Sequence, residues 1–305
     1  MSAPPSGRQY RITSGDHAAV VTQVGATLRE CLLAGAPVLD GFEETERSPD
    51  GRGQVLAPFP NRLAGGRYTF GGRTCQVPLN EPGAGNAIHG LVRWLDWAEV
   101  SVTPQDVVLA CVLRPQPAYE WELSLEVGYH LADDGLTVAS TATSTGTEPA
   151  PFGLGFHPYL GLGARVEGLE LSLPARTHSP VPADRDEEPV PVDVTGSDLD
   201  FRTARAVGSR RLDTVFGDLT RGPDGRAVVH LVDPASARGV RLWVDEAFGY
   251  LMVYSADDVL PRERRRQALA VEPMTCPPHA FRSGVAVVTL APGESWSGAW
   301  GLAAG

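Results

Sequence analysis

Apolar and polar residues alternate along much of this chain, and the clearest example lies near its middle. Every odd position of residues 121–131 is apolar, which predicts a strand with one buried face. A turn at residues 133–135 precedes a second run at 136–143, so the two runs predict a β-hairpin. Residues 68–70 and 74–77 flank Gly71-Gly72 and predict another hairpin with a two-residue turn.

Short apolar runs between turn residues predict further strands. We expect them at residues 18–24, 27–33, 97–103, 107–113, 169–173, 228–232, 240–244, 250–255, 285–290 and 296–300. No long stretch shows the 3.6-residue period of a helix, so the pattern favours an all-β sandwich or barrel over a βαβ fold. The acidic, proline-rich residues 180–191 predict a surface excursion, because strand signals resume on both sides. We therefore expect one domain over residues 1–305.

Composition and charge narrow the classes of function. The apolar share is 42% and the charged share 21%, as in soluble globular proteins. The net charge of −11 argues against a nucleic-acid or membrane partner and is compatible with a neutral small molecule. All 26 basic residues are arginine, which excludes lysine Schiff-base chemistry and a lysine-containing phosphate loop.

Several common cofactor signatures are missing from the sequence. The four cysteines form no C-x-x-C pair and no two histidines have short metal-ligand spacing, so no metal or redox dithiol is indicated. G-x-G-x-x-G, G-x-S-x-G and H-E-x-x-H do not occur. Free thiols suit a reducing compartment, and neither a signal core nor a long apolar span is visible. We expect a cytoplasmic protein without a cofactor.

Three segments place polar side chains in apolar surroundings. They cover residues 57–70, 86–97 and 151–160, and their polar positions include Asn61, Arg62, His89 and His157. The Arg62 guanidinium suits vicinal hydroxyls or a carboxylate, but it can equally tie down its own loop. For His89, a structural histidine with satisfied hydrogen bonds is the alternative to a ligand-binding one.

Glu272 raises the question of what a carboxylate does in an apolar run. It follows the apolar residues 268–271, which we interpret as the end of a buried strand, where a carboxylate is costly. His157 and Glu272 both precede a proline, which favours extended backbone and a preorganised geometry. A histidine and a glutamate can act together as acid and base, so hydrolysis, isomerisation and epimerisation all remain open.

Five motifs in order resemble the aldose 1-epimerase, or galactose mutarotase-like, family. They are PFPNRLAGGRYTF, NAIHGLVRWLDW, GFHPYL, LDTVF and AVEPMTCPP, within residues 55–281. The resemblance implies a large single-domain β-supersandwich that interconverts the α and β anomers of a monosaccharide without a cofactor. It also implies that Glu272 is the general base and His157 the general acid, and that the sugar is bound by Asn61, Arg62, His89 and Asp213.

The region after His89 leaves the preferred sugar open. Arg93 completes an H-G-x-x-R arrangement similar to the hexose-6-phosphate mutarotase branch, whereas NRLAGGRYTF resembles the free-sugar branch. We favour a neutral aldohexose, and a phosphosugar enzyme would require Arg93 and another arginine to converge at one end of a pocket. A non-catalytic carbohydrate-binding protein is the third possibility. Cys276 and His279 are expected to be structural.

Overall fold

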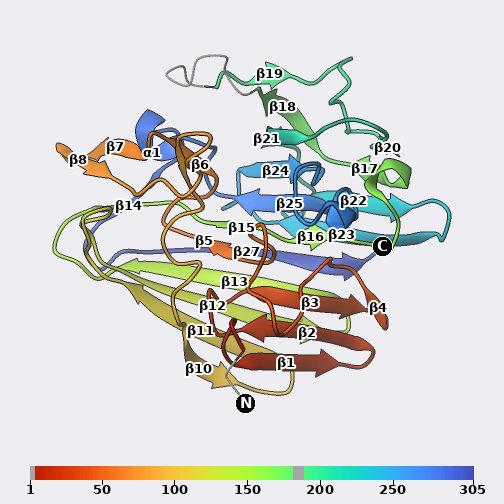
Figure 1. Cartoon of the computed structure of the whole chain (residues 1–305), viewed down its shortest axis with the longest axis horizontal. Helices are drawn as coiled ribbons and strands as arrows, with labels where there is room; N and C mark the ends of the chain where they lie inside the picture. Colours follow the sequence, from red (N-terminus) through yellow and green to blue (C-terminus); the bar gives the residue numbers. More distant parts are fainter. Residues whose placement is uncertain (1–3, 181–188) are drawn as a thin grey trace.

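Two large antiparallel sheets dominate the computed structural model, which describes residues 4–180 and 189–305 (Figure 1). Within these residues the first sheet has nine strands, in the spatial order β10-β11-β12-β13-β27-β23-β22-β17-β20. In that order they span Ala98–Val102, Asp106–Leu113, Leu123–Ala132, Gly135–Ser144, Ser295–Ala304, Arg238–Val244, Ala227–Asp233, Glu170–Ser172 and Arg205–Ala206.

The second large sheet lies over the first in Figure 1 and has eight strands within the described ranges. Seven follow the order β19-β18-β21-β24-β25-β15-β5, and β16 pairs with β25. The seven span Val192–Asp193, Ala175–Ser179, Asp213–Leu219, Tyr250–Tyr254, Leu269–Met274, Gly155–Phe156 and Val55–Leu56, and β16 spans Tyr159–Leu160.

Smaller elements complete the part of the chain that the structure describes. A four-stranded sheet of β1 (Gln9–Ser14), β2 (His17–Thr22), β3 (Leu28–Leu33) and β4 (Ala36–Pro37) lies beside β12. Pairs are formed by β6 (Arg62–Ala64) with β9 (Asn86–Ile88), β7 (Arg67–Phe70) with β8 (Arg73–Gln76), and β14 (Ala150–Phe152) with β26 (Val288–Leu290). The helical elements are η1 (Val166–Gly168), η2 (Arg262–Arg264) and α1 (Ala280–Ser283).

One continuous apolar core joins the two large sheets, because each turns an apolar face toward the other. Strand β12 alternates buried and more exposed positions along its whole length, as the period of two predicted. Its Val127 belongs to the same core as Leu242 of β23 and as Val253 and Val271 of β24 and β25. The expected all-β sandwich is therefore confirmed.

The short hairpin also follows its sequence closely. Phe70 and Arg73 pair across Gly71 and Gly72, whose φ angles are 57° and 78°. A two-residue turn with both φ angles positive matches the twist of the flanking strands and favours glycine at both positions.

The structure differs from one expectation about where a segment ends and leaves another untested. The interpretation that a buried strand ends before Glu272 was wrong, because β25 continues through Pro273 to Met274. Met252 of β24 pairs with Glu272, and Leu251 pairs with Pro273, so neighbouring strands hold the carboxyl in mid-strand. The expected excursion at residues 180–191 lies mostly outside the described residues, and the single-domain organisation stays a prediction.

Candidate active site

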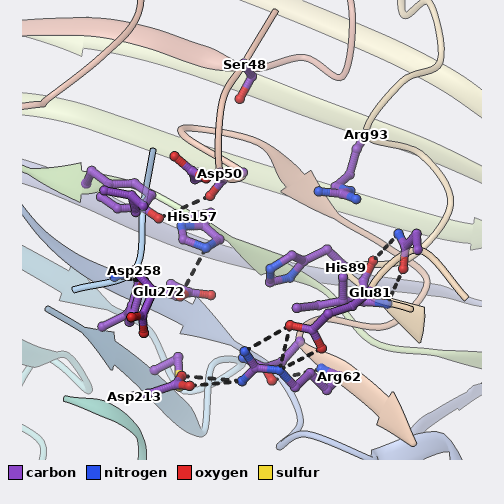
Figure 2. A pocket seen from close by; sticks show the side chains of 18 of the residues that line it. Ser48, Asp50, Arg62, Glu81, His89, Arg93, His157, Asp213, Asp258 and Glu272 are labelled. Carbon is purple, nitrogen blue, oxygen red and sulfur yellow. Dashed lines mark hydrogen bonds and ion pairs between the residues drawn. The ribbon is translucent and has the colours of Figure 1, made fainter. Parts of the chain in front are cut away.

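A cavity of about 470 Å³ opens beside β25 and the break between β15 and β16 (Figure 2). This volume is typical of small-molecule sites, which span about 300–1,000 Å³. All six residues singled out from the sequence line this cavity, namely Asn61, Arg62, His89, His157, Asp213 and Glu272. The fold thus brings together side chains that are up to 211 positions apart in the chain.

His157 faces Glu272 because a proline interrupts the strand opposite β25. Strands β15 and β16 both pair with β25, and His157-Pro158 forms the break between them. The Val271 amide donates to the Pro158 carbonyl oxygen at 3.2 Å, so the backbone stays close to β25 across the break. The His157 Nε2 atom lies 3.3 Å from Glu272 Oε1.

Backbone bonds and ring stacking hold the His157 imidazole. Its amide donates to the Gln54 carbonyl oxygen at 3.2 Å, and its own carbonyl oxygen accepts from the Gly53 amide at 2.9 Å. The Tyr159 ring stacks on the imidazole with 4.9 Å between centroids and 10° between planes. The Arg52 guanidinium lies over the Tyr159 ring, 4.3 Å from its centroid, so His157 has little freedom to turn.

Burial sets the protonation states of this pair. Glu272 is 2% exposed, and burial, with a smaller contribution from the Asp213 charge, raises its pKa well above the usual value. The pKa of His157 is lowered to about 3, mainly by burial, with smaller contributions from the positive charges of Arg52, Arg93 and Arg62. In the free protein the favoured state is therefore a protonated carboxyl beside an uncharged imidazole.

Arg62 connects two carboxylates at one side of the cavity. Its Nη1 lies 3.2 Å from Asp213 Oδ2, and its Nε lies 3.1 Å from Glu81 Oε2. The Asn86 side-chain amide also donates to Glu81 Oε2, at 2.7 Å. Arg62 thus fixes both the loop that carries Glu81 and the first residue of β21, as Figure 2 shows. Arg62 can therefore anchor its own loop and at the same time form part of the cavity wall, so the two interpretations of this residue are compatible.

Asn61 and His89 reach the cavity from left-handed backbone, which asparagine and histidine adopt more readily than most residues. Their φ angles are 55° and 64°, in the left-handed region that is costly for most side chains. The His89 amide donates to the Asn61 carbonyl oxygen at 2.9 Å, and the Arg62 amide donates to Asn61 Oδ1 at 2.8 Å. These bonds aim both side chains into the cavity.

His89 differs from a structural histidine with satisfied hydrogen bonds. Its ring meets the His157 ring edge to face, with centroids 5.1 Å apart and planes at 75°. Burial is the main cause of its lowered pKa, followed by the nearby His157 and Arg93. Its Nδ1 atom is buried without a hydrogen bond to any described residue. A buried polar atom without a partner in a cavity wall favours a ligand-binding role.

Sequence reasoning missed several cavity residues. Glu81 follows no motif, and only its pairing with Arg62 reveals it. The sequence contains a signal for Tyr159, because it belongs to the GFHPYL motif, but only the structure shows that its ring stacks on His157.

Cys276 and His279 lie outside the cavity wall. Cys276 is fully buried, and burial raises its pKa to about 12. His279 Nδ1 accepts a hydrogen bond from the Ala64 amide at 3.1 Å.

Two findings concern metal ligands and membrane-spanning helices within residues 4–180 and 189–305. No group of three or more histidine, cysteine, aspartate or glutamate side chains is placed to hold a metal ion there. Over the same residues, none of the helices has the length and apolar character that crossing a membrane requires.

The sequence and the fold resemble those of known proteins. The aldose 1-epimerase family model matches residues 8–302. Uncharacterized protein YihR of Escherichia coli K12 is 34% identical over 292 residues, which cover 95% of this chain and 91% of YihR. The aldose 1-epimerase of the same organism is 27% identical over 282 residues, covering 84% of this chain and 79% of the enzyme.

Two solved structures share the fold. The GalM/aldose epimerase homologue of Caenorhabditis elegans superimposes with a TM-score of 0.85 at 19% identity, covering 98% of each chain. Galactose 1-epimerase of Lactobacillus acidophilus gives a TM-score of 0.75 at 21% identity, covering 95% of this chain and 91% of that one. At these identities the likeness concerns the fold alone.

Proposed function

This chain belongs to the aldose 1-epimerase family, and on that premise we propose that it interconverts the α and β anomers of an aldohexose. The observation that carries the proposal is the contact of 3.3 Å between Glu272 and His157 on the wall of a cavity. Both side chains are at least 95% buried, so the acid and the base are shielded from bulk water. Proton transfer between such groups and a bound sugar opens and closes the ring.

In the proposed reaction the two residues act on the two oxygens of the anomeric carbon. The Glu272 carboxylate removes the proton from the C1 hydroxyl, and His157 Nε2 donates a proton to the ring oxygen. The bond between C1 and the ring oxygen breaks and leaves an aldehyde. After rotation about the C1–C2 bond the ring closes on the other face, with the two roles exchanged.

The charge state that burial favours in the free protein fits this cycle. Ring opening converts a carboxylate and an imidazolium into a carboxyl and a neutral imidazole, which is the state that burial favours. The pair carries one proton in either form, and one transfer across the 3.3 Å contact interconverts them. Burial therefore favours the ring-opened stage, while the charged form starts each turnover.

The other cavity residues suit recognition of sugar hydroxyls. We propose that Asp213 and Arg62 bind hydroxyls at the side away from Arg93, because carboxylates and guanidinium groups bond well to vicinal hydroxyls. Asn61 and His89 present polar atoms beside the reacting pair. The unpartnered His89 Nδ1 would gain a hydrogen bond from the sugar.

Two other functions remain less well supported. A phosphosugar enzyme needs converging arginines, but Arg62, which shares the cavity with Arg93, is already paired with Asp213 and Glu81. A purely carbohydrate-binding protein has no need of a buried acid–base pair, whose desolvation costs stability. The Glu272–His157 contact therefore favours catalysis.

Anomer-resolved NMR tests the proposal directly. Freshly dissolved α-D-glucose and α-D-galactose are followed with wild type, Glu272→Gln and His157→Asn. We expect each substitution to lower the rate about 10²–10⁴-fold, the usual contribution of a positioned acid or base. Glu148→Gln, at an exposed carboxylate paired with Arg73, serves as the control and retains the wild-type rate. Equal rates in all these proteins would refute the catalytic role of the pair.

A further inference from the structure

Arg93 carries a charge that nothing described in the structure neutralises. Its Nη1 donates to Gln54 Oε1 at 3.3 Å, and the Gln54 amide donates back to the Arg93 carbonyl oxygen at 3.3 Å. Its Nε atom is buried without a hydrogen bond to a described residue. Burial lowers the pKa of the guanidinium to about 10, and no described carboxylate offsets that effect. A carboxamide therefore orients Arg93 without compensating its charge.

A half-buried guanidinium without a carboxylate partner is costly for any protein. The chain has a net charge of −11, and the other arginine on the cavity wall, Arg62, pairs with two carboxylates. A partly buried charge without a counter-ion lowers stability unless a ligand supplies the opposite charge. The Arg93 Cζ atom lies over the Trp94 ring, 5.5 Å from the ring centroid, and this contact limits the movement of the guanidinium.

We propose, building on the proposed function, that Arg93 recognises a single negative charge on the aldose, carried by a carboxylate or a sulfonate away from C1. Arg93 and Asp213 lie on opposite sides of the cavity in Figure 2. The carboxylates of Asp213 and Glu81 repel an anion from their own side, so only the Arg93 side attracts it. Arg93 thus sets both the substrate class and the orientation of the sugar.

One guanidinium matches a singly charged group better than a phosphate monoester. A phosphate carries about −1.5 to −2 charges at neutral pH, and a single arginine compensates one. The second arginine of the cavity, Arg62, is held by Glu81 and Asp213. A carboxylate or a sulfonate takes two parallel hydrogen bonds from one guanidinium and leaves no uncompensated charge.

Binding of an anion also affects the reacting pair. The Arg93 charge is among those that lower the pKa of His157. A ligand anion beside Arg93 offsets that charge and makes the imidazole easier to protonate. We therefore expect the acid limb of kcat to lie at higher pH for an anionic sugar than for its neutral counterpart.

Kinetics on matched sugars test this inference. Anomer exchange is measured for D-glucose and D-galactose and for derivatives with a carboxylate, a sulfonate or a phosphate at C6. We expect kcat/KM of wild type to be highest for the carboxylate or the sulfonate, and Arg93→Gln to lower the ratio of anionic to neutral kcat/KM about 10- to 100-fold. Arg93→Lys should restore part of that ratio. Arg114→Gln, at an exposed arginine paired with Glu122, should leave the ratio unchanged.

Measuring how glycosides bind to the wild-type protein distinguishes this inference from the proposed function. The measurement does not require that any variant folds. Methyl glycosides cannot open, so calorimetry with the methyl α-glycosides of glucose and glucuronic acid, and with a 6-sulfonate, reports recognition alone. Tighter binding of the anionic glycosides, weakened by salt, supports the inference. The inference is overturned if neutral and anionic glycosides bind equally well or if a phosphate is preferred. It is also overturned if anomer exchange shows no preference for an anionic sugar. Anionic binding without anomer exchange refutes the proposed function instead.

Discussion

Gly51 offers a sharp test of how closely the cavity holds His157. Its φ angle is 79°, and a Cβ atom added there would lie 2.9 Å from His157 Cδ2. Ordinary van der Waals contact begins at 3.4 Å, so Gly51→Ala forces the imidazole or the loop to move by about 0.5 Å. Tyr159 is stacked on the ring, which limits how the ring can yield.

The expected loss follows from this displacement. A misplacement of about 1 Å costs about 10²-fold in rate, so about half of that shift should lower kcat about 10-fold. An alanine in the left-handed region also lowers the free energy of unfolding by about 1–2 kcal/mol. Anomer-resolved NMR measures the first effect, and urea denaturation measures the second.

Gly163→Ala is the matched control, because Gly163 has a φ angle of 81° and nothing within 4 Å of an added Cβ. Both alanine variants should lose the stability that a left-handed alanine costs, and Gly51→Ala should lose more because of its contact with His157. Only Gly51→Ala should lose rate. A wild-type kcat in Gly51→Ala would refute the argument that this contact positions His157. An equal loss of rate in Gly163→Ala would instead trace the effect to backbone strain in general.

Three further predictions concern the groups around the reacting pair. Burial raises the pKa of Glu272 above its ordinary 4.5 and lowers that of His157 below its ordinary 6.5, so the two effects on stability oppose each other between these values. Wild-type stability should therefore fall as pH rises from about 6.5 through the raised pKa of Glu272, by about 1.4 kcal/mol per pH unit. Glu272→Gln should abolish that fall and be more stable than wild type at pH 7 in urea denaturation. The Asp213 charge raises the pKa of Glu272, so Asp213→Asn should move the alkaline limb of the kcat profile to lower pH. Tyr159→Leu removes the ring stacked on His157 and should lower kcat about 10-fold, whereas Tyr159→Phe should lose much less.

Each of these predictions has an opposing outcome. Stability of Glu272→Gln that follows the wild-type pH profile would show that another group causes the fall. Asp258→Asn is the control for Asp213→Asn, because Asp258 lines the same cavity and pairs with Arg211 but is no cause of the Glu272 shift. An equal shift in both variants would contradict a specific Asp213 effect. Equal losses in Tyr159→Leu and Tyr159→Phe would assign the role to the hydroxyl, which donates to the Asp50 carbonyl oxygen.

The strands that the sequence predicted well are those with one buried face. In β12 and β13 the alternation is strong because one sheet face packs on the core and the other is more exposed. Strand β21 was missed, because its polar ends and internal glycine give no alternation. It forms a strand because β18 and β24 pair with its two edges. These pairings join segments that are distant in the chain.

The sequence by itself determined the all-β class, the residue types of the proposed acid–base pair and the motifs that carry them, because these depend on local alternation and on residue identity. Only the tertiary structure decided that β25 runs on through Pro273, that the break at Pro158 turns His157 toward Glu272, and that none of the described carboxylates pairs with Arg93. Burial and pairing of charges arise from segments far apart in the chain. No local pattern encodes them.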